Sequence, residues 1–395
     1  MASETAAAPR PSRPVPWRDP RVRGIVLQVL FVALIVAIIA FLVHNTVVNL
    51  RRQSIASGFG FMEREAAFGI GESLIAYSPA DTYARAFLVG LTNTLYVSAL
   101  GIVLATILGT VMGLARLSGN WLVSKLAQIY VEMFRNIPLA LQLLFWWGLL
   151  RQAAPGPRQA WQVLPDVFVS NRGVAFPVPR EDPAFAWMLL ALLVGVAGTW
   201  LVFRWARARQ ARTGQPFPTG WVGLATIVGL PLAVFVASGA PLALDVPALK
   251  GFNFSGGAAV SPEFAALLIG LVIYTGSFIT EIVRAGILAV SWGQSEAAMA
   301  LGLKSGQRMR LVVLPQALRV IVPPMTSEYL SLTKNSSLAV IIGFPDLVSV
   351  ANTAMNQTGQ AVEGIALIMA VYLAISLIIS LLMNLYNRAV ALVER

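Results

Sequence analysis

The chain has no cysteine and only one histidine among its 395 residues. Without cysteine there are no disulfides, no thiolate metal sites and no cysteine nucleophiles. The single histidine, His44, cannot form a histidine-based metal cluster, and a Ser-His-Asp triad would have to depend on it alone. It follows a long apolar run, which is more typical of an interfacial residue than of a catalytic one. We therefore expect no metal site and no catalytic residue in this chain.

Charged residues are also scarce. Asp, Glu, Lys and Arg make up 12% of the chain, against about a quarter in typical globular proteins. Hydrophobic residues make up 57%, and several charge-free runs approach the ~18 residues that a membrane-spanning helix needs. The net charge of +11 can indicate nucleic-acid binding, but in a membrane protein it is typical of cytoplasmic loops beside anionic lipid. We therefore expect membrane lipid and no nucleic acid among the partners.

Motifs of nucleotide hydrolysis and of membrane enzymes are missing too. No glycine directly precedes a lysine anywhere in the chain, so the phosphate-binding loop G-x-x-x-x-G-K-[ST] is absent. The HExxH and GxSxG motifs are absent as well. We expect the chain itself to hold no cofactor and to catalyse no reaction.

Eight apolar segments predict an all-α integral membrane protein. Arg204–Arg212, between the fourth and fifth segments, is strongly basic and marks the inside of the membrane. An even number of spans places both termini on that same side. The segments are Gly24–Val43, Ala86–Ala115, Leu126–Leu150, Phe185–Phe203, Trp221–Ala240, Phe264–Val290, Leu311–Thr333 and Gly364–Tyr386.

A short amphipathic loop follows the sixth segment. Residues Ser295–Leu303 are tolerant of a helix, and Gly302 supplies a break near its end. Met299 and Leu303 form an apolar side, while Glu296 stays on the polar side. A small, alanine-lined helix of this kind suits docking into a groove on another protein. The alternative is a helix lying on lipid, which prefers bulkier apolar residues with basic edges.

Two pairs of opposite charges lie in or beside the spans. Burying an ionisable side chain costs about 2.5–3.5 kcal/mol on insertion scales, so each needs a partner or a wet cavity. Glu132 and Arg135 are three residues apart on one helical face, as are Glu281 and Arg284. Either each pair satisfies itself near the inner interface, or the charges face a translocation path.

The seventh span carries a further set of polar residues. We expect it to bend at Pro323–Pro324, because neither proline donates a backbone hydrogen bond. Arg319 and Glu328 flank this bend and either contact a substrate or gate, or pack against a partner subunit. Lys334 and Asn335, at the outer end, either line the path or anchor the span at the interface. Residues 337–351 are too few to cross the membrane and predict a re-entrant or interfacial helix.

The loop after the sixth span resembles that of the permease subunits of bacterial ABC importers. That family's loop reads EAA, three residues, Gly, nine residues, an aliphatic residue, one residue, then Leu-Pro. Here Glu296-Ala297-Ala298, Gly302, Val312 and Leu314-Pro315 fit every spacing, with Val in place of the usual Ile. Four further segments are similar to the polar-amino-acid branch of this family: Arg135–Leu149, Ile279–Ile287, Leu314–Pro324 and Lys334–Gly343. The length of the chain, its extra first span and its long mid-chain insertion are similar to those of the larger permease of general L-amino-acid importers.

The resemblance implies a type I importer permease that works by alternating access in the bacterial inner membrane, with both termini cytoplasmic. It implies a second permease, homologous or identical, two cytoplasmic ATPase subunits that bind ATP and Mg, and a periplasmic amino-acid-binding protein. The cargo would be an L-amino acid. Glu296, Ala297, Ala298, Gly302 and Leu303 would couple to the ATPase. The substrate path would involve Glu132, Arg135, Glu281, Arg284, Arg319, Glu328, Lys334 and Asn335.

The same resemblance divides the chain into six parts. Segments without a counterpart in shorter members of the family are expected to be peripheral. The parts are a cytoplasmic tail (1–23), an extra span (24–44), a periplasmic loop (45–85), core spans two and three (86–150), an insertion with two spans (151–262), and core spans six to eight with the coupling loop 291–310 (263–388).

Two other functions stay open. A secondary transporter or channel working alone would be expected to show inverted repeats and more acids at the membrane centre, and no convincing repeat is visible. A scaffold without transport would not need paired charges within its spans.

Overall fold

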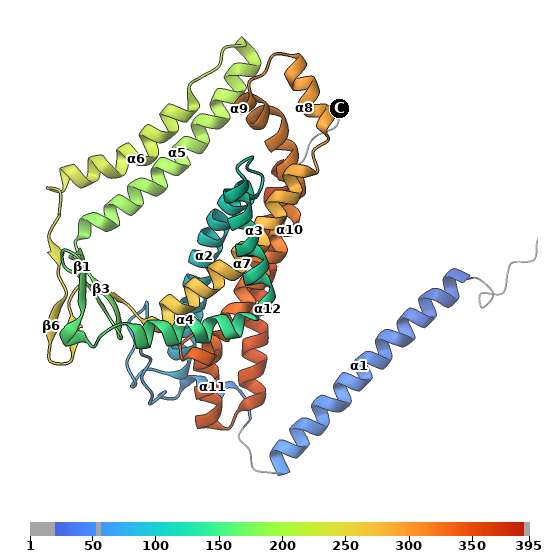
Figure 1. Ribbon diagram of the computed structural model, residues 1–395. Helices are drawn as coiled ribbons and strands as arrows, with labels where there is room; N and C mark the ends of the chain where they lie inside the picture. The colour runs from blue at the N-terminus through green and yellow to red at the C-terminus, as the bar shows by residue number, and fades with distance from the viewer. Residues whose placement is uncertain (1–19, 53–56, 391–395) are drawn as a thin grey trace, which may run out of the picture. The chain divides into compact units, whose positions relative to one another are not determined.

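The computed structural model describes residues 20–52 and 57–390, in which long helices predominate (Figure 1). Most of the predicted tail, residues 1–19, lies outside the described residues. The α-helices are α1 (Pro20–Arg52), α2 (Tyr83–Arg116), α3 (Trp121–Asn136), α4 (Leu139–Ala153), α5 (Pro183–Thr213), α6 (Thr219–Ala237), α7 (Pro262–Leu288), α8 (Trp292–Ala300), α9 (Ser305–Arg308), α10 (Leu314–Asn335), α11 (Leu347–Thr358) and α12 (Ala361–Val390). The shorter turns are η2 (Phe59–Glu63), η3 (Pro157–Gln159), the π-helical η4 (Met309–Val313) and η5 (Ser336–Ile342).

Six helices of the described residues are long and apolar enough to cross a membrane: α1, α2, α5, α6, α7 and α12. A seventh candidate is the bent pair formed by residues 305–342 and 347–358, which meet at 52°. That break begins at Gly343, which has a φ of +79°, and it lies within residues 337–351, the segment predicted to be re-entrant or interfacial. Helices α1, α2, α5 and α12 reach beyond the predicted apolar segments at both ends, whereas α6 and α7 begin before their predicted segments and also end before them. The basic segment Arg204–Arg212 is itself helical.

The prediction of one continuous third span over Leu126–Leu150 was wrong. Helix α3 ends at Asn136 and α4 begins at Leu139, with Ile137 in an extended conformation between them (φ −96°, ψ 125°). Pro138 explains the break, because a proline disfavours the helical conformation of the residue before it. The total of eight spans is therefore not confirmed.

Short strands flank the α5–α6 hairpin, and the all-α prediction did not include them. They form a four-stranded sheet in the order β1-β2-β3-β8 and two strand pairs, β4-β5 and β6-β7. The β3–β8 and β4–β5 pairs join the two stretches of chain on either side of the hairpin. The strands are β1 (Trp161–Leu164), β2 (Val167–Ser170), β3 (Gly173–Phe176), β4 (Val178–Pro179), β5 (Leu244–Asp245), β6 (Ala248–Lys250), β7 (Asn253–Ser255) and β8 (Ala258–Val260).

The described residues form two compact units, one of residues up to 90 with 350–374, the other of residues 91–349 with 375 onward. In the first unit, the loop before α2 is fixed by both apolar and polar contacts. Phe61 is buried and packs edge-on against Tyr83 and Phe87. The backbone N–H of Gly58 donates to the Glu363 carboxylate at 2.5 Å, and the Gly58 carbonyl accepts from Gln360.

In the second unit, α7 is the most enclosed of the candidate spans. It contacts α3, α4 and α10. In its most apolar stretch of 18 residues 56% are buried, against 6% or less in the corresponding stretches of α1, α5, α6 and α12. The apolar core includes Leu267, Leu271 and Ile279 of α7. Within this unit, α5 and α6 therefore leave most of their apolar side chains free for lipid or a partner subunit, whereas α7 is packed against three neighbouring helices.

Two glycines of α2 allow this close packing. A Cβ atom at Gly109 would lie 2.5 Å from Cγ2 of Ile279 and 2.9 Å from the carbonyl oxygen of Gly276. A Cβ at Gly113 would lie 2.8 Å from Val283. Small residues at such positions are a common way for helices to approach within a membrane.

We predict that Gly109→Ala destabilises the protein by about 1–3 kcal/mol, the usual cost of overpacking, because backbone atoms of α7 cannot yield. Thermal unfolding in detergent, followed by tryptophan fluorescence, measures the loss. Gly148→Ala is the matched control, since a Cβ at Gly148 of α4 meets nothing within 4 Å. Equal melting temperatures for the two variants would contradict the proposed packing.

Candidate functional site

Helix α8 contains the EAA residues of the predicted loop. The predicted helix Ser295–Leu303 was displaced by three residues at each end: α8 begins at Trp292 and ends at Ala300. It follows α7 after a break of three residues, Ala289–Ser291. A displacement of α8 therefore has a short covalent path to the most enclosed span.

The end of α8 is fixed by the residue that the sequence singled out as a break. Gly302 has a φ of +75°, a conformation that L side chains rarely adopt. Its N–H donates to the Met299 carbonyl at 2.9 Å, and the Leu303 N–H donates to the Ala298 carbonyl at 3.1 Å. This pair of bonds is the Schellman motif, which satisfies helix-end carbonyls and turns the chain sharply.

One side of α8 is packed and the other is open. Ser295 and Ala298 are buried, where the helix contacts α9 and η4. Glu296 and Ala297 are exposed, and Leu301 is 81% exposed. The buried side is thus smaller and more polar than the predicted Met299–Leu303 side, since Met299 is 45% exposed and Leu303 is partly buried.

A charge cluster lies at the ends of α2 and α7. The Glu281 carboxylate pairs with Nη2 of Arg284 at 2.9 Å, as the spacing predicted, and also with the guanidinium of Arg116. The acid is 20% exposed and the two arginines are 18% and 33% exposed. One carboxylate therefore holds two cations together, and the cluster keeps a net positive charge.

The second predicted pair does not form. Glu132 and Arg135, both within the described residues, make no ion pair with each other. The Glu132 carboxylate accepts from Nε2 of Gln128 at 2.5 Å. Arg135 instead lies over the Phe278 ring, 4.7 Å from its centroid, and is close enough to act electrostatically on Glu328 of α10. Residues on one helical face need not pair when a neighbouring helix offers a better partner.

The remaining path candidates lie along α10. Arg319 and Glu328 are partly buried, and α10 is one helix from Leu314 to Asn335 that includes Pro323 and Pro324. Lys334 is exposed and Asn335 is partly buried, both in the last turn of the helix. Arg135 is thus near enough to Glu328 to act on it electrostatically, whereas no ion pair within the described residues includes Lys334 or Asn335.

Sequence reasoning missed several polar contacts between helices. Arg116 was not among the predicted site residues, although a basic residue in the last turn of a span was a signal for a charge partner. The Tyr130 hydroxyl donates to the Ile273 carbonyl at 2.8 Å, and the hydroxyls of Thr106 and Tyr329 lie 2.9 Å apart. No spacing rule indicates such contacts, since they join segments far apart in the chain.

The described residues contain no group of three or more His, Cys, Asp or Glu side chains that could hold a metal ion.

Comparison with known families gives the class of the protein. The model of the binding-protein-dependent transport system inner membrane component matches residues 101–392, which is more than half of the chain. The chain belongs to this family. The family resemblance inferred from the EAA loop is thereby confirmed, as is the multi-pass inner-membrane class. This permease is a component of a transport system that depends on a binding protein.

Three known permeases align with nearly all of this permease. The general L-amino acid transport system permease protein AapQ of Rhizobium johnstonii is 51% identical, covering 95% of this chain and 94% of its own. The putative amino-acid ABC transporter permease protein YhdX of Escherichia coli is 52% identical, covering 96% and 97%. The glutamate/glutamine/aspartate/asparagine permease BztB of Rhodobacter capsulatus is 42% identical, covering 95% and 96%.

Among solved structures, the crystal structure of an amino acid ABC transporter with histidines aligns with the permease at a TM-score of 0.46 and 22% identity. The alignment covers 78% of this chain and 95% of that one.

We predict that Arg116→Gln destabilises the permease by about 1–2 kcal/mol, because Glu281 loses one of its two cations. Breaking a buried ion pair costs ~3–5 kcal/mol, and partial exposure reduces that cost. Denaturation in detergent measures it. Arg151→Gln is the matched control: Arg151 pairs with Glu263 at 3.0 Å but is 50% exposed, so its loss should cost under ~1 kcal/mol. An equal cost for both variants would contradict the role of the cluster.

Proposed function

We propose that this permease is the membrane subunit of an ATP-driven importer of L-amino acids. The observation that carries the proposal is the near full-length identity, 51% and 52%, to two permeases named for amino-acid transport. A third relative is named for glutamate, glutamine, aspartate and asparagine, which favours a polar amino acid. The test is nucleotide-dependent uptake of a panel of amino acids by the reconstituted complex, measured with and without this subunit. Uptake that does not require the subunit would contradict the proposal.

The mechanism proposed is alternating access. ATP and Mg bind two cytoplasmic ATPase subunits, a periplasmic binding protein delivers the amino acid, and a second permease forms the other half of the path. The division of this chain into a permease core, an extra first span and an inserted hairpin is part of the proposal. The proposal also places both termini in the cytoplasm. This topology has eight membrane crossings: the six candidate helices, the bent pair of residues 305–358, and α3 with α4 as one broken span.

Helix α8 is the proposed joint between the ATPase and the spans. Its exposed side carries Glu296, Ala297 and Leu301, and small side chains allow close approach by a groove on a partner. Its buried side rests on α9 and η4, which lead directly into α10. A push on α8 would therefore reach α7 through the chain before it and α10 through the contacts behind it.

The proposed substrate path uses charges that different helices bring together. An amino acid carries an α-carboxylate and an α-ammonium, so a path needs both a cation and an anion. Arg135 of α3, which lies over the Phe278 ring, supplies the cation, and Glu328 of α10, on which Arg135 acts electrostatically, supplies the anion. The Arg116–Glu281–Arg284 cluster is better explained as a structural clamp, because its charges are already engaged with one another.

We predict that Gly302→Asp uncouples ATP hydrolysis from uptake while the complex still assembles. Any side chain at a φ of +75° strains the turn that ends α8, although the space around Gly302 is open. The ratio of amino acids transported to ATP hydrolysed in proteoliposomes should fall at least tenfold. Gly306→Asp is the control, since Gly306 is equally open and does not have a positive φ. An unchanged ratio in Gly302→Asp would contradict the joint.

We predict that Glu328→Gln and Arg135→Gln each lower uptake at least tenfold with little change in melting temperature, because each removes one charge from the proposed path. Initial uptake rates across a range of substrate concentrations measure the effect. Lys125→Gln, an exposed charge on α3, is the control. Wild-type uptake rates in both path variants would contradict a substrate path that uses Arg135 and Glu328.

A further inference from the structure

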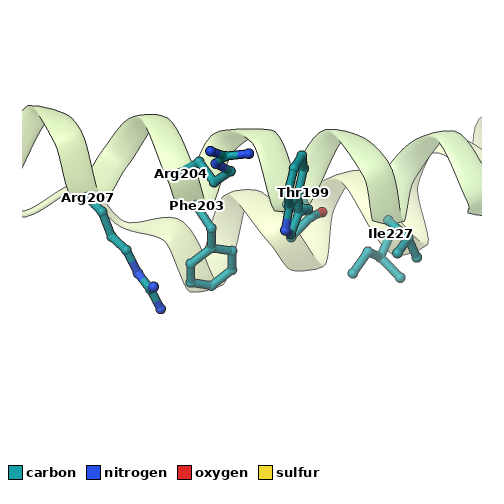
Figure 2. Close-up of a pocket in the computed structure, with 7 residues that line it drawn as sticks. Thr199, Phe203, Arg204, Arg207 and Ile227 are labelled. Atoms are coloured by element: carbon teal, nitrogen blue, oxygen red, sulfur yellow. The ribbon is translucent and has the colours of Figure 1, made fainter. Parts of the chain in front are cut away.

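A groove of about 400 Å³ opens on the surface of the α5–α6 hairpin (Figure 2). Nothing in the proposed transport cycle uses it. Its lining combines apolar and aromatic side chains with two arginines. The lining residues are Val196, Thr199, Trp200, Phe203, Arg204, Arg207 and Ile227.

The two helices that form the groove are in close contact beside Thr199, one of its lining residues. A Cβ at Gly195 would lie 2.6 Å from the Thr226 carbonyl oxygen, and one at Gly223 would lie 2.9 Å from Cγ2 of Thr199. The hydroxyls of Thr199 and Thr226 are 2.7 Å apart. Small residues with hydroxyls bonded across the interface hold membrane helices in one fixed geometry. The groove is therefore part of the fold of the hairpin.

The lining changes character along the groove. Figure 2 shows Arg204 and Arg207 towards one end and Ile227 at the other, with Phe203 between the two arginines. Arg204 lies over the Trp200 ring, 4.8 Å from its centroid. Residues 183–244 contain no acidic side chain, so no carboxylate of the hairpin neutralises these cations. The groove is therefore positively charged, and its charge favours an anionic ligand.

The apolar part of the groove narrows the choice of anion. Three apolar lining side chains are exposed: Trp200 is 57% exposed, Val196 50% and Phe203 40%. Both helices are candidate membrane spans, so these side chains are available to a lipid chain. From residue 196 to residue 207 the helix rises roughly 16 Å, at 1.5 Å per residue. That length accommodates a phosphate at the arginine end and the first part of an acyl chain along the apolar end. A free phosphate ion would leave the apolar lining uncovered.

We infer that this groove binds an anionic phospholipid, with its headgroup phosphate at the end of the groove that carries Arg204 and Arg207 and an acyl chain along Val196, Trp200 and Ile227. Basic pockets between membrane helices are known to select anionic headgroups in this way. The inference requires only that the hairpin spans the membrane, and it does not depend on the proposed cargo or coupling.

Native mass spectrometry of the full chain, purified with its co-purifying subunits in mild detergent, tests the inference. The protein is titrated with phosphatidylglycerol, with phosphatidylcholine of the same chains, and with phosphatidylglycerol in excess inorganic phosphate. The variant Arg204→Gln/Arg207→Gln should bind phosphatidylglycerol about thirtyfold more weakly, at ~1 kcal/mol per arginine. Arg207→Gln alone should lose about fivefold and serves if the double variant is not monodisperse.

The matched control is Arg209→Gln/Arg212→Gln. It removes the same charge from the same helix, but Arg209 lies against Trp205 and Phe217 and neither arginine lines the groove. We expect near wild-type phosphatidylglycerol binding in this control, weak phosphatidylcholine binding, and little competition from phosphate. Equal losses in the two double variants, equal binding of both lipids, or displacement by millimolar phosphate would each overturn the inference.

Discussion

The close packing of α2 on α7 is the contact on which the rest of the second unit depends. Gly109 and Gly113 have no side chain where Ile279 and Val283 press against α2, so the two backbones can approach. The same approach brings Arg116 within reach of Glu281. Steric fit along the helices and electrostatic pairing at their ends therefore select one register between them, and α3, α4 and α10 pack around α7 in that register.

Polar groups within this unit are satisfied between helices as much as within them. A membrane offers no water to an unpaired hydroxyl or guanidinium, so neighbouring helices must supply the partner. Tyr130 reaches a backbone carbonyl of α7, and Thr106 of α2 meets Tyr329 of α10. Such bonds join separate helices to one another in the arrangement that the structure shows.

The sequence was informative wherever a local pattern had one physical solution. Long apolar runs predicted membrane helices, and the spacing of Glu281 and Arg284 predicted their ion pair. It failed where tertiary neighbours decided the outcome. Arg135 lies over an aromatic ring of α7 and acts electrostatically on an acid of α10, and it does not pair with Glu132. The strands flanking α5–α6 pair across more than 60 residues of sequence. The break before α4 was predictable, because Pro138 interrupts a run that hydropathy alone treats as continuous.

The Schellman turn at Gly302 has a thermodynamic consequence for any partner that receives α8. Two backbone hydrogen bonds set the direction of the chain after the helix, so Leu301 projects from a support that is already ordered. A protrusion shaped in advance loses little conformational entropy when it docks, and more of the contact energy survives as affinity. In the proposed joint, the same turn would pass a displacement of the tip on to the helices that α8 contacts.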